Sequence, residues 1–549
     1  MNSIEFSLSN SFYNREAIEE AIQDFKEFAD IQLLDESFGL KLYSEKYSPE
    51  VLKDEFSNYV LGLVKNMYSE NNENPIDESK FKELEDNEMY FNGLKNREIG
   101  NKLLLTTETG KWTFIEKTLY KPLIQLDAEK TGELIKDMID KKMIITKQNL
   151  PSVAEDMRSK KDFLFQGTAL HIVVVTLQCN LNCIYCHASS KPYGEKQYDM
   201  DEETAKKTVD LIFQTPSKQI TIEFQGGEPL LNFEIIKYIV NYAKEKNKEI
   251  QKDLRFSVVS NLLPLTNEML NFFIEQEVHI CTSLDGPKEL HDHNRGAYDK
   301  TIEAINKIRK ENKKQGVMWK MNALVTITRE SLKYPREIID EYIDKGFHQI
   351  HLRNLNILGC AKSNNKIYYP AEEFNEFWKK SMDYIIELNK KGTKFIERKT
   401  QLILRKLYES YDPNYTELRS PCGAIIGQLT YNYNGDVYTC DEGRMIKEDL
   451  FNIGKVDNSY PEITTSDQAC SIIASSVNDT QFCDKCVYKP FCGICPVYNF
   501  SEEGSVIGNI PGSDWCKINK FQFDYIFGKL QEEDTRDILL EWIAPEKGE

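Results

Sequence analysis

The chain has 549 residues, a formal net charge of −19 and 13 cysteines, so it is too long for one hydrophobic core and, lacking a basic tract, poorly suited to nucleic acid. No stretch approaches the ~20 apolar residues of a membrane span, and the start MNSIEFSLSN lacks a secretory signal, which predicts a cytoplasmic protein without a membrane partner. In that reducing compartment the cysteines favour metal or redox chemistry over disulfides.

Residues 1–75 are expected to form a small α/β domain. Hydrophobic spacing predicts a strand at IEFSL, a helix through Ile18 and Phe25, strands at IQLLD and GLKLYS, and a second helix from Leu52 to Val64. The polar run SENNENPIDESK that follows is typical of a linker. The segments SFYNREAIEEA and EFSNYVL resemble the small accessory protein of His-Xaa-Ser repeat peptide systems, here fused to the rest of the chain.

Residues 85–150 form a second compact pattern. NKLLLTT and KWTFIE predict a hairpin, and LYKPLIQ and TGELIKDMIDKKMII predict helices. The pattern resembles the winged-helix leader-peptide recognition element of peptide-modifying systems, in which the leader adds a strand to the sheet edge. A structural cap on the next domain is the alternative.

Residues 165–400 alternate between strand and helix patterns. The six expected strands are HIVVVTL, ITIEF, RFSVVS, VHICTSL, MNALVTI and QIHLRN. Strands alternating with amphipathic helices indicate an α/β fold with a parallel sheet and right-handed crossovers, hence a partial (β/α)6 barrel. Functional loops of such barrels lie at the C-terminal ends of the strands.

The first strand leads into TLQCNLNCIYCHA, where Cys179, Cys183 and Cys186 have CxxxCxxC spacing. Three thiolates can hold three irons of a 4Fe-4S cluster and leave the fourth open. The spacing, with Tyr185 before the last cysteine, resembles the radical S-adenosylmethionine (SAM) enzymes. In that family the open iron chelates SAM, and the cluster cleaves it to a 5'-deoxyadenosyl radical. A zinc site completed by His187 is the alternative.

The second strand is followed by FQGGEPLL. Gly226 and Gly227 let backbone approach a ligand closely, and Glu228 can accept from an ammonium group. The run from Gln225 to Glu228 resembles the family's GGE motif, which implies that it holds the amino group of SAM.

Later strand ends carry further cofactor contacts by the same resemblance. Ser260 and Asn261 follow the third strand, and SLDGPKELHDHNR follows the fourth. Ser283 could bond a ribose hydroxyl, and Arg295 could pair with the SAM carboxylate, as in the branch that modifies peptides and sulfatases. Arg295 in a surface ion pair is the alternative. Leu355, after the sixth strand, is an adenine contact or a core residue.

Several reactive residue types are expected outside these sites. His291 and His293 lie in a polar loop and are predicted to be solvated. Cys281, Cys360 and Cys470 fit no cluster pattern and are interpreted as thiols outside the clusters, with Cys281 buried in a strand.

Seven of the eight cysteines in residues 415–520, all except Cys470, stand in an order that resembles the SPASM extension, which binds two auxiliary 4Fe-4S clusters. The resemblance assigns one cluster to Cys483, Cys486, Cys492 and Cys516, and the other to Cys422, Cys440 and Cys495. Two residues rather than three separate the cysteines of CGIC, a departure from the pattern. No cysteine stands just upstream of the first of the seven, so one auxiliary iron is expected to be open. A zinc knuckle is the alternative for CDKCVYKPFCGIC. Residues 521–549 are predicted to form a C-terminal helix.

Asp441 follows Cys440 at the position of the proposed base in sulfatase maturases. A base beside an auxiliary cluster could take the proton released when a substrate radical is oxidised. Glu442 could replace it, Asp441 could be a cap residue, or the open iron could bind a substrate thiol and make a base less necessary.

Together these motifs look most like the maturases of His-Xaa-Ser systems. The resemblance implies a radical SAM enzyme that modifies a ribosomally made precursor peptide by thioether formation, carbon-carbon crosslinking or oxidation. It implies SAM, three 4Fe-4S clusters and an electron donor such as flavodoxin or ferredoxin. The alternatives are an anaerobic sulfatase-maturating, formylglycine-generating enzyme and a non-catalytic iron-sulfur electron-transfer protein.

Overall fold

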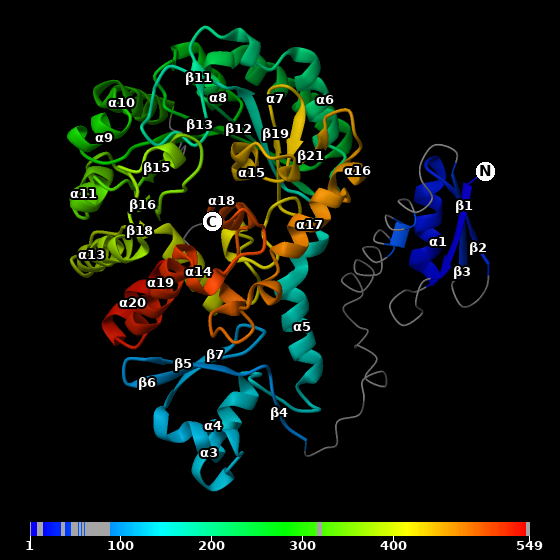
Figure 1. The fold of residues 1–549 in the computed structure, drawn as a ribbon, viewed down its shortest axis with the longest axis vertical. Helices are drawn as coiled ribbons and strands as arrows, with labels where there is room; N and C mark the ends of the chain where they lie inside the picture. Colours follow the sequence, from blue (N-terminus) through cyan, green and yellow to red (C-terminus); the bar gives the residue numbers. More distant parts are fainter. Residues whose placement is uncertain are drawn as a thin grey trace. The chain divides into compact units, whose positions relative to one another are not determined.

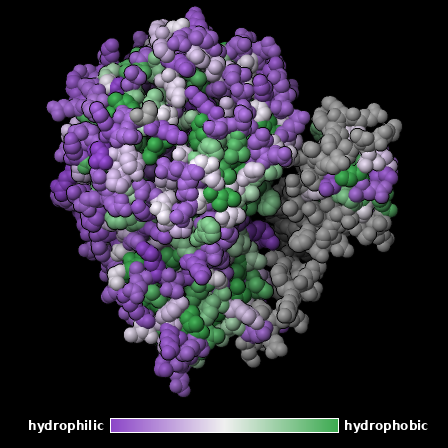
Figure 2. Space-filling model, in the orientation of Figure 1, coloured by the Kyte–Doolittle hydropathy of each residue, from purple (hydrophilic) through white to green (hydrophobic). Residues whose placement is uncertain are grey.

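The computed structural model describes residues 2–7, 15–34, 39–44, 53, 56–57, 60, 88–315 and 321–544. The chain separates into two units, Met1–Glu85 and Asp86–Glu549. Within the described ranges no helix has the length and apolar content needed to span a membrane. The face drawn in Figure 2 is largely hydrophilic, with apolar residues in separate patches.

Among its described residues, the first unit contains helix α1 and a three-stranded antiparallel sheet of order β1-β3-β2. Its elements are β1 (Asn2–Ser7), α1 (Arg15–Asp24), η1 (Phe25–Glu27), β2 (Asp30–Leu33) and β3 (Gly39–Ser44). Ala17, Ile18 and Ala21 of α1 are fully buried with Leu40 and Leu42 of β3. The elements follow the predicted order. Most of the predicted second helix and the linker lie outside the described residues.

The second unit begins with a small antiparallel sheet of order β5-β6-β7. The elements of this part are β4 (Tyr90–Phe91), β5 (Lys95–Ile99), β6 (Lys102–Thr106), β7 (Trp112–Glu116), α3 (Tyr120–Ile124), α4 (Ala128–Asp140), β8 (Ile144–Ile145) and α5 (Leu150–Lys161). The predicted hairpin is β6 and β7, and β5 adds a third strand. Leu103, Leu105, Ile115 and Met138 share one core. Helix α5 then leads towards the large sheet (Figure 1).

Within the described residues the large sheet has nine strands, and its first six are parallel in the order β17-β15-β14-β13-β12-β9. Their bounds are β9 (Leu170–Thr176), β12 (Gln219–Gly226), β13 (Asp253–Ser260), β14 (Val278–Ser283), β15 (Asn322–Thr326) and β17 (Leu352–Arg353). The predicted α/β class and parallel strands are therefore confirmed. The expected sixth strand is divided, because Gln349–Ile350 (β16) pairs instead with β18 (Ile396–Glu397).

Helices cover one face of this sheet (Figure 1). They are α6 (Glu202–Ile212), α7 (Phe233–Ile250), α8 (Asn267–Glu275), α9 (Lys288–Asn294), α10 (Tyr298–Gln315) and α11 (Glu337–Asp344). The next two helices, α13 (Ala371–Lys390) and α14 (Arg398–Tyr408), lie beside β18. On β12 the fully buried Ile222 and Phe224 alternate with the half-buried Glu223. Because side chains alternate across a strand, Glu223 lies on the opposite, polar face of the sheet. There the hydroxyl of Ser257 on β13 donates to the Glu223 carboxylate at 3.0 Å.

The cysteine-rich C-terminal region extends the same sheet. Strand β19 (Gln428–Tyr431) pairs in parallel with β9, and β20 (Asp436–Tyr438) and β21 (Asn452–Lys455) follow antiparallel. The predicted single helix at 521–549 is wrong: α19 (Asp514–Leu530) begins inside the cysteine region, and α20 (Glu533–Glu541) follows a break. Ser513 caps α19 by accepting from the Cys516 N–H, which ties the helix to a predicted cluster ligand.

Candidate cofactor and cluster sites

The loop with CxxxCxxC spacing leaves the end of β9 and is held there by Asp199. The carboxylate of Asp199 accepts from the Thr176 hydroxyl at 2.5 Å and from the Gln178 amide at 2.7 Å. Within the loop, the Cys186 N–H donates to the Cys183 carbonyl at 3.1 Å. Cys183 and Cys186 therefore share one turn, and Cys179 ends the short strand β10 (Gln178–Cys179) that precedes it.

Gly226 and Gly227 bring the end of β12 onto this loop. A Cβ added at Gly226, where φ is +154°, would lie 2.0 Å from the Thr176 carbonyl oxygen. A Cβ at Gly227 would lie 2.3 Å from the Gln178 carbonyl oxygen. The sequence suggested that these glycines permit approach to a ligand; in the structure the close approach is between the two loops. This contact places Glu228 beside the cysteines.

Glu228 is 1% exposed and is held by three donors. Its Oε1 accepts from the Ser260 hydroxyl at 2.7 Å and the Leu230 N–H at 3.0 Å, and its Oε2 accepts from the Asn261 N–H at 2.7 Å. The side-chain amide nitrogen of Asn261, Nδ2, lies 4.0 Å from the Cys179 sulfur. Ser260 thus orients Glu228, and a direct cofactor contact for it stays a prediction.

Burial raises the pKa of Glu228 to about 7, although its hydrogen bonds oppose the shift. Between the ordinary carboxyl pKa and about 7, Glu228 is therefore protonated in the folded protein and ionised in the unfolded chain. The free energy of unfolding falls as pH rises through this range, because the buried side chain must then become charged. Wild type should lose thermal stability between pH 5 and pH 8 relative to Glu228→Gln, measured without cofactor. The comparison uses the change in stability with pH and not the stability at one pH. The Gln amide places a donor against the Asn261 N–H, which lowers the stability of the variant at every pH. Equal pH dependence of both proteins would contradict the shift.

Arg295 is packed against the cysteine loop. Its guanidinium carbon lies 5.6 Å from the Tyr185 ring centroid, and its Nε is buried without a hydrogen-bond partner. Arg295 forms no salt bridge with any described residue. The structure therefore does not support the alternative that Arg295 belongs to a surface ion pair. Tyr185 in turn donates its hydroxyl to Asp285 at 2.6 Å. Since buried polar atoms are usually paired, the free Nε is suited to an anionic ligand group.

The loop carrying Arg295 differs from expectation at one histidine. His291 is 1% exposed, its Nδ1 accepts from the Asp285 N–H at 3.3 Å, and burial lowers its pKa. The prediction that it is solvated is wrong, because α9 turns it inward towards Asp285. His293 is exposed as predicted. Asp285 was missed, although an aspartate directly after a strand end was the available signal.

The remaining predicted cofactor contacts also lie at strand ends. Gln225 near the end of β12 donates its amide to Glu223 at 2.8 Å, and Ser283 ends β14. Leu355 follows β17, is 6% exposed and donates its N–H to the Tyr369 hydroxyl at 2.7 Å. Contacts from these three side chains to a cofactor stay predictions.

Four cysteines of the C-terminal region line one pocket, the outer cysteine pocket: Cys483, Cys486, Cys492 and Cys516. About 370 Å³ of space there is free of protein atoms, part of it open to solvent. The pocket walls include Tyr488, Trp515 and Phe523. Four thiols around one apolar-walled space fit the donor set of a 4Fe-4S cluster.

The inner trio consists of the other three predicted cluster ligands, Cys422, Cys440 and Cys495. Cys440 caps α15 (Asp441–Ile446), and Cys495 caps α18 (Pro496–Glu503), with their sulfurs accepting backbone N–H bonds at 3.2 and 3.4 Å. Burial raises the pKa of the Cys440 thiol, and the charges of Cys422 and Cys495 act on it in the same direction. The charge of Cys422 also acts on the Cys495 thiol, so the three cysteines lie in one neighbourhood, and a shared cluster stays a prediction. Across the described ranges, no three His, Cys, Asp or Glu side chains are grouped so as to hold a single metal ion.

Residues 173–342 match the profile of the Radical SAM superfamily. Over this segment the chain is similar to that superfamily. The chain is 25% identical over 367 residues to a cysteine-type anaerobic sulfatase-maturating enzyme of Clostridium perfringens, covering 64% of this chain and 94% of that protein. It is 22% identical over 368 residues to the radical SAM cyclopropyl synthase TigE of Paramaledivibacter caminithermalis, covering 62% and 73%. The solved structure of native anSMEcpe with bound AdoMet shares the fold, with a TM-score of 0.55, 21% identity, and coverage of 67% of this chain and 100% of that one.

The two carboxylates that follow Cys440 enter different ion pairs. Asp441 accepts from Arg444 Nε at 3.2 Å and Nη2 at 2.9 Å, and burial raises its pKa against the opposing charge of Arg444. Glu442 accepts from Arg353 Nη2 at 3.1 Å. The role of Arg353 was missed, although a charged residue at the end of the sixth strand pattern was a visible signal.

Proposed function

We propose that this chain is a radical SAM enzyme that modifies a ribosomally made peptide. The observation that carries the proposal is the meeting of the cysteine loop, the buried Glu228 carboxylate and the buried, unpaired Nε of Arg295 at one edge of the sheet. Cys179, Cys183 and Cys186 would hold the cluster, Glu228 the SAM ammonium group and Arg295 the SAM carboxylate. When bound, the cluster and SAM supply a 5'-deoxyadenosyl radical that removes a hydrogen atom from the peptide.

The protein's own residues would orient the reactants and move protons. Glu223 and Ser257 make one sheet face polar, which suits a peptide more than an apolar substrate. Asp441 would take the proton released on oxidation of the substrate radical. Cys483, Cys486, Cys492 and Cys516 would hold the outer auxiliary cluster, and the inner trio the other, so that the electron has acceptors inside the protein. A flavodoxin or ferredoxin would supply the reducing electron.

A peptide substrate is supported by relatives of the same fold. The anSMEcpe structure with bound AdoMet and Kp18Cys peptide has a TM-score of 0.56 to this chain at 21% identity. The finer assignment, to a His-Xaa-Ser maturase with a fused accessory unit, rests on the sequence motifs and on the separate Met1–Glu85 unit. Co-expression with short peptides encoded beside the gene, followed by mass spectrometry, tests it: a mass change on one peptide supports the proposal, and unmodified peptides throughout contradict it.

The second candidate function is sulfatase maturation. It is favoured by the match over 94% of the Clostridium perfringens enzyme and by the Cys440-Asp441 pair. The residues before the radical SAM domain favour the peptide maturase, since the match covers only 64% of this chain. Formylglycine formation on a sulfatase-derived cysteine peptide would select the sulfatase maturase.

Asp441→Asn is expected to abolish peptide product while leaving cluster content and SAM cleavage intact. The amide keeps an oxygen for Arg444 but cannot take a proton. Product is measured by mass spectrometry, and Glu442→Gln is the matched control on the neighbouring carboxylate. Full turnover by Asp441→Asn would indicate that the open auxiliary iron binds and deprotonates a substrate thiol. Loss of product in Glu442→Gln alone would identify Glu442 as the base.

Removal of residues 1–85 is expected to leave SAM cleavage intact and to lower peptide modification at least tenfold. The cut falls between the two compact units, so the second unit keeps its core. A cut at 160 would be less informative, because Lys160 of α5 donates to the Glu409 carbonyl at 2.6 Å and Lys161 to the Ser420 carbonyl at 2.6 Å. Unchanged modification by the 86–549 protein would exclude the first unit from peptide recognition.

A further inference from the structure

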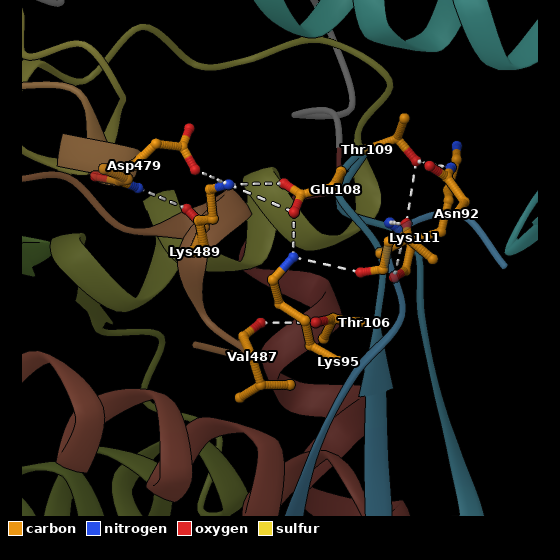
Figure 3. A network of polar contacts seen from close by, with 12 residues as sticks. Asn92, Lys95, Thr106, Glu108, Thr109, Lys111, Asp479, Val487 and Lys489 are labelled. Atoms are coloured by element: carbon orange, nitrogen blue, oxygen red, sulfur yellow. Dashed lines mark hydrogen bonds and ion pairs between the residues drawn. The ribbon is translucent and has the colours of Figure 1, made fainter. Parts of the chain in front are cut away.

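The β5–β7 sheet packs against the loop that joins two ligands of the outer cysteine pocket. Between Cys486 and Cys492, the Val487 carbonyl accepts from the buried Thr106 hydroxyl at 2.8 Å (Figure 3). A Cβ added at Gly110, in the β6–β7 turn, would lie 3.2 Å from the Phe491 ring. The sheet therefore packs against the segment that carries two of the four pocket cysteines, Cys486 and Cys492.

An ionic chain fastens the same two segments. Lys489 Nζ lies 3.2 Å from the carboxylate of Glu108 in the β6–β7 turn, and it also pairs with Asp479. Glu108 is paired in turn with Lys95 of β5, whose side chain is 7% exposed (Figure 3). The turn is thus held to the cysteine loop by charge as well as by packing.

Arg97 of β5 places a cation beside the pocket. Its Nε and Nη2 each lie 2.7 Å from a carboxylate oxygen of Asp524 in α19, and its guanidinium carbon lies 5.7 Å from the Tyr488 ring centroid. Tyr488 lines the pocket and also donates its hydroxyl to Asp524. Both members of the ion pair are partly exposed, 41% for Arg97 and 33% for Asp524, so the charges act through partly solvated surroundings.

We propose that the β5–β7 sheet completes the outer cluster site, and that Arg97 raises the reduction potential of the cluster held there. The inference rests on the proposed function for the presence of a 4Fe-4S cluster in the outer cysteine pocket. Reduction adds one negative charge to such a cluster, so a nearby cation stabilises the reduced form and a nearby anion destabilises it. Arg97 and Asp524 should therefore act in opposite directions, and Thr106 acts through the loop as a positioning residue.

The test uses anaerobically prepared full-length protein with Arg97→Gln and Asp524→Asn. Iron content and the midpoint potential of each cluster are measured at low ionic strength, where screening is weak. Arg97→Gln should lower the outer cluster's potential and Asp524→Asn should raise it, with iron content unchanged. Lys117→Gln is the control, since Lys117 pairs with Glu98 on the same sheet at 2.7 Å with exposures of 41% and 69%.

Shifts of the same sign in both variants, or no shift in either, would overturn the role of Arg97, because loosening of the site predicts no opposition of sign. A second variant, Thr106→Val, tests whether the β5–β7 sheet completes the cluster site. It removes the hydrogen bond to the Val487 carbonyl and keeps the shape of the side chain. This variant should lose the outer cluster's irons to a chelator faster than wild type does, and equal retention would overturn this role of the sheet. Wild-type protein without iron in the outer pocket would instead overturn the proposed cofactor content itself.

Discussion

Replacing Cys183 by alanine is expected to abolish reductive cleavage of SAM and to lower iron from about twelve to about eight per chain. Cys183 is the middle member of the loop after β9, and two remaining thiolates do not hold a 4Fe-4S cluster open to SAM. The outer cysteine pocket and the inner trio are built by other segments and should keep their irons. Anaerobic iron analysis and chromatography of 5'-deoxyadenosine measure both effects.

The control for this result is Cys470→Ala. Cys470 is exposed on α17 (Asp467–Ser475) and its thiol lies 3.7 Å from the Thr465 carbonyl, within its own segment. Iron content and cleavage should match wild type. Cleavage surviving in Cys183→Ala, or stoichiometric zinc with little iron in wild type, would contradict the cluster assignment.

Arg295→Ala is expected to weaken SAM binding by about 2 to 4 kcal/mol, the cost of removing one partner of a buried charge pair. Its Nε has no hydrogen-bond partner among the residues that the structure describes, so the SAM carboxylate would be the group that satisfies it. Iron content should be retained, because Arg295 is not among the cysteine ligands. Affinity is measured by anaerobic equilibrium binding.

Arg329→Ala is the matched control for Arg295. Arg329 pairs with Glu373 at 3.2 Å, and both side chains are 46% exposed. Such a surface pair contributes little, so its loss should leave SAM affinity unchanged. Equal affinity in Arg295→Ala and wild type would return Arg295 to a structural role.

The parallel sheet and the position of Glu228 could be predicted because their signals are local. Apolar runs such as HIVVVTL predict buried parallel strands, and the six predicted runs correspond to β9, β12, β13, β14, β15 and, for the divided sixth run, β16 and β17. Glu228 follows two glycines at a strand end, and parallel strands bring their C-terminal ends to one edge. The closeness of Glu228, Asn261 and Cys179 follows from that topology.

Other features depend on contacts between distant segments, for which a single sequence holds no signal. The pairing of β19 with β9 joins residues about 260 positions apart in the chain. The burial of His291 depends on Asp285 across a turn. The Arg97–Asp524 pair joins β5 to α19 across 427 positions. Hydrophobic period does not specify such partners.

The most direct test of the account is formation of 5'-deoxyadenosine by the anaerobic, chemically reduced wild-type protein supplied with SAM. The arrangement of the cysteine loop, Glu228 and Arg295 predicts that 5'-deoxyadenosine and methionine form in equal amounts, and that Glu228→Gln and Arg295→Ala lower the yield. Iron-loaded, reduced protein that leaves SAM intact would contradict the radical assignment and favour a non-catalytic iron-sulfur electron-transfer protein.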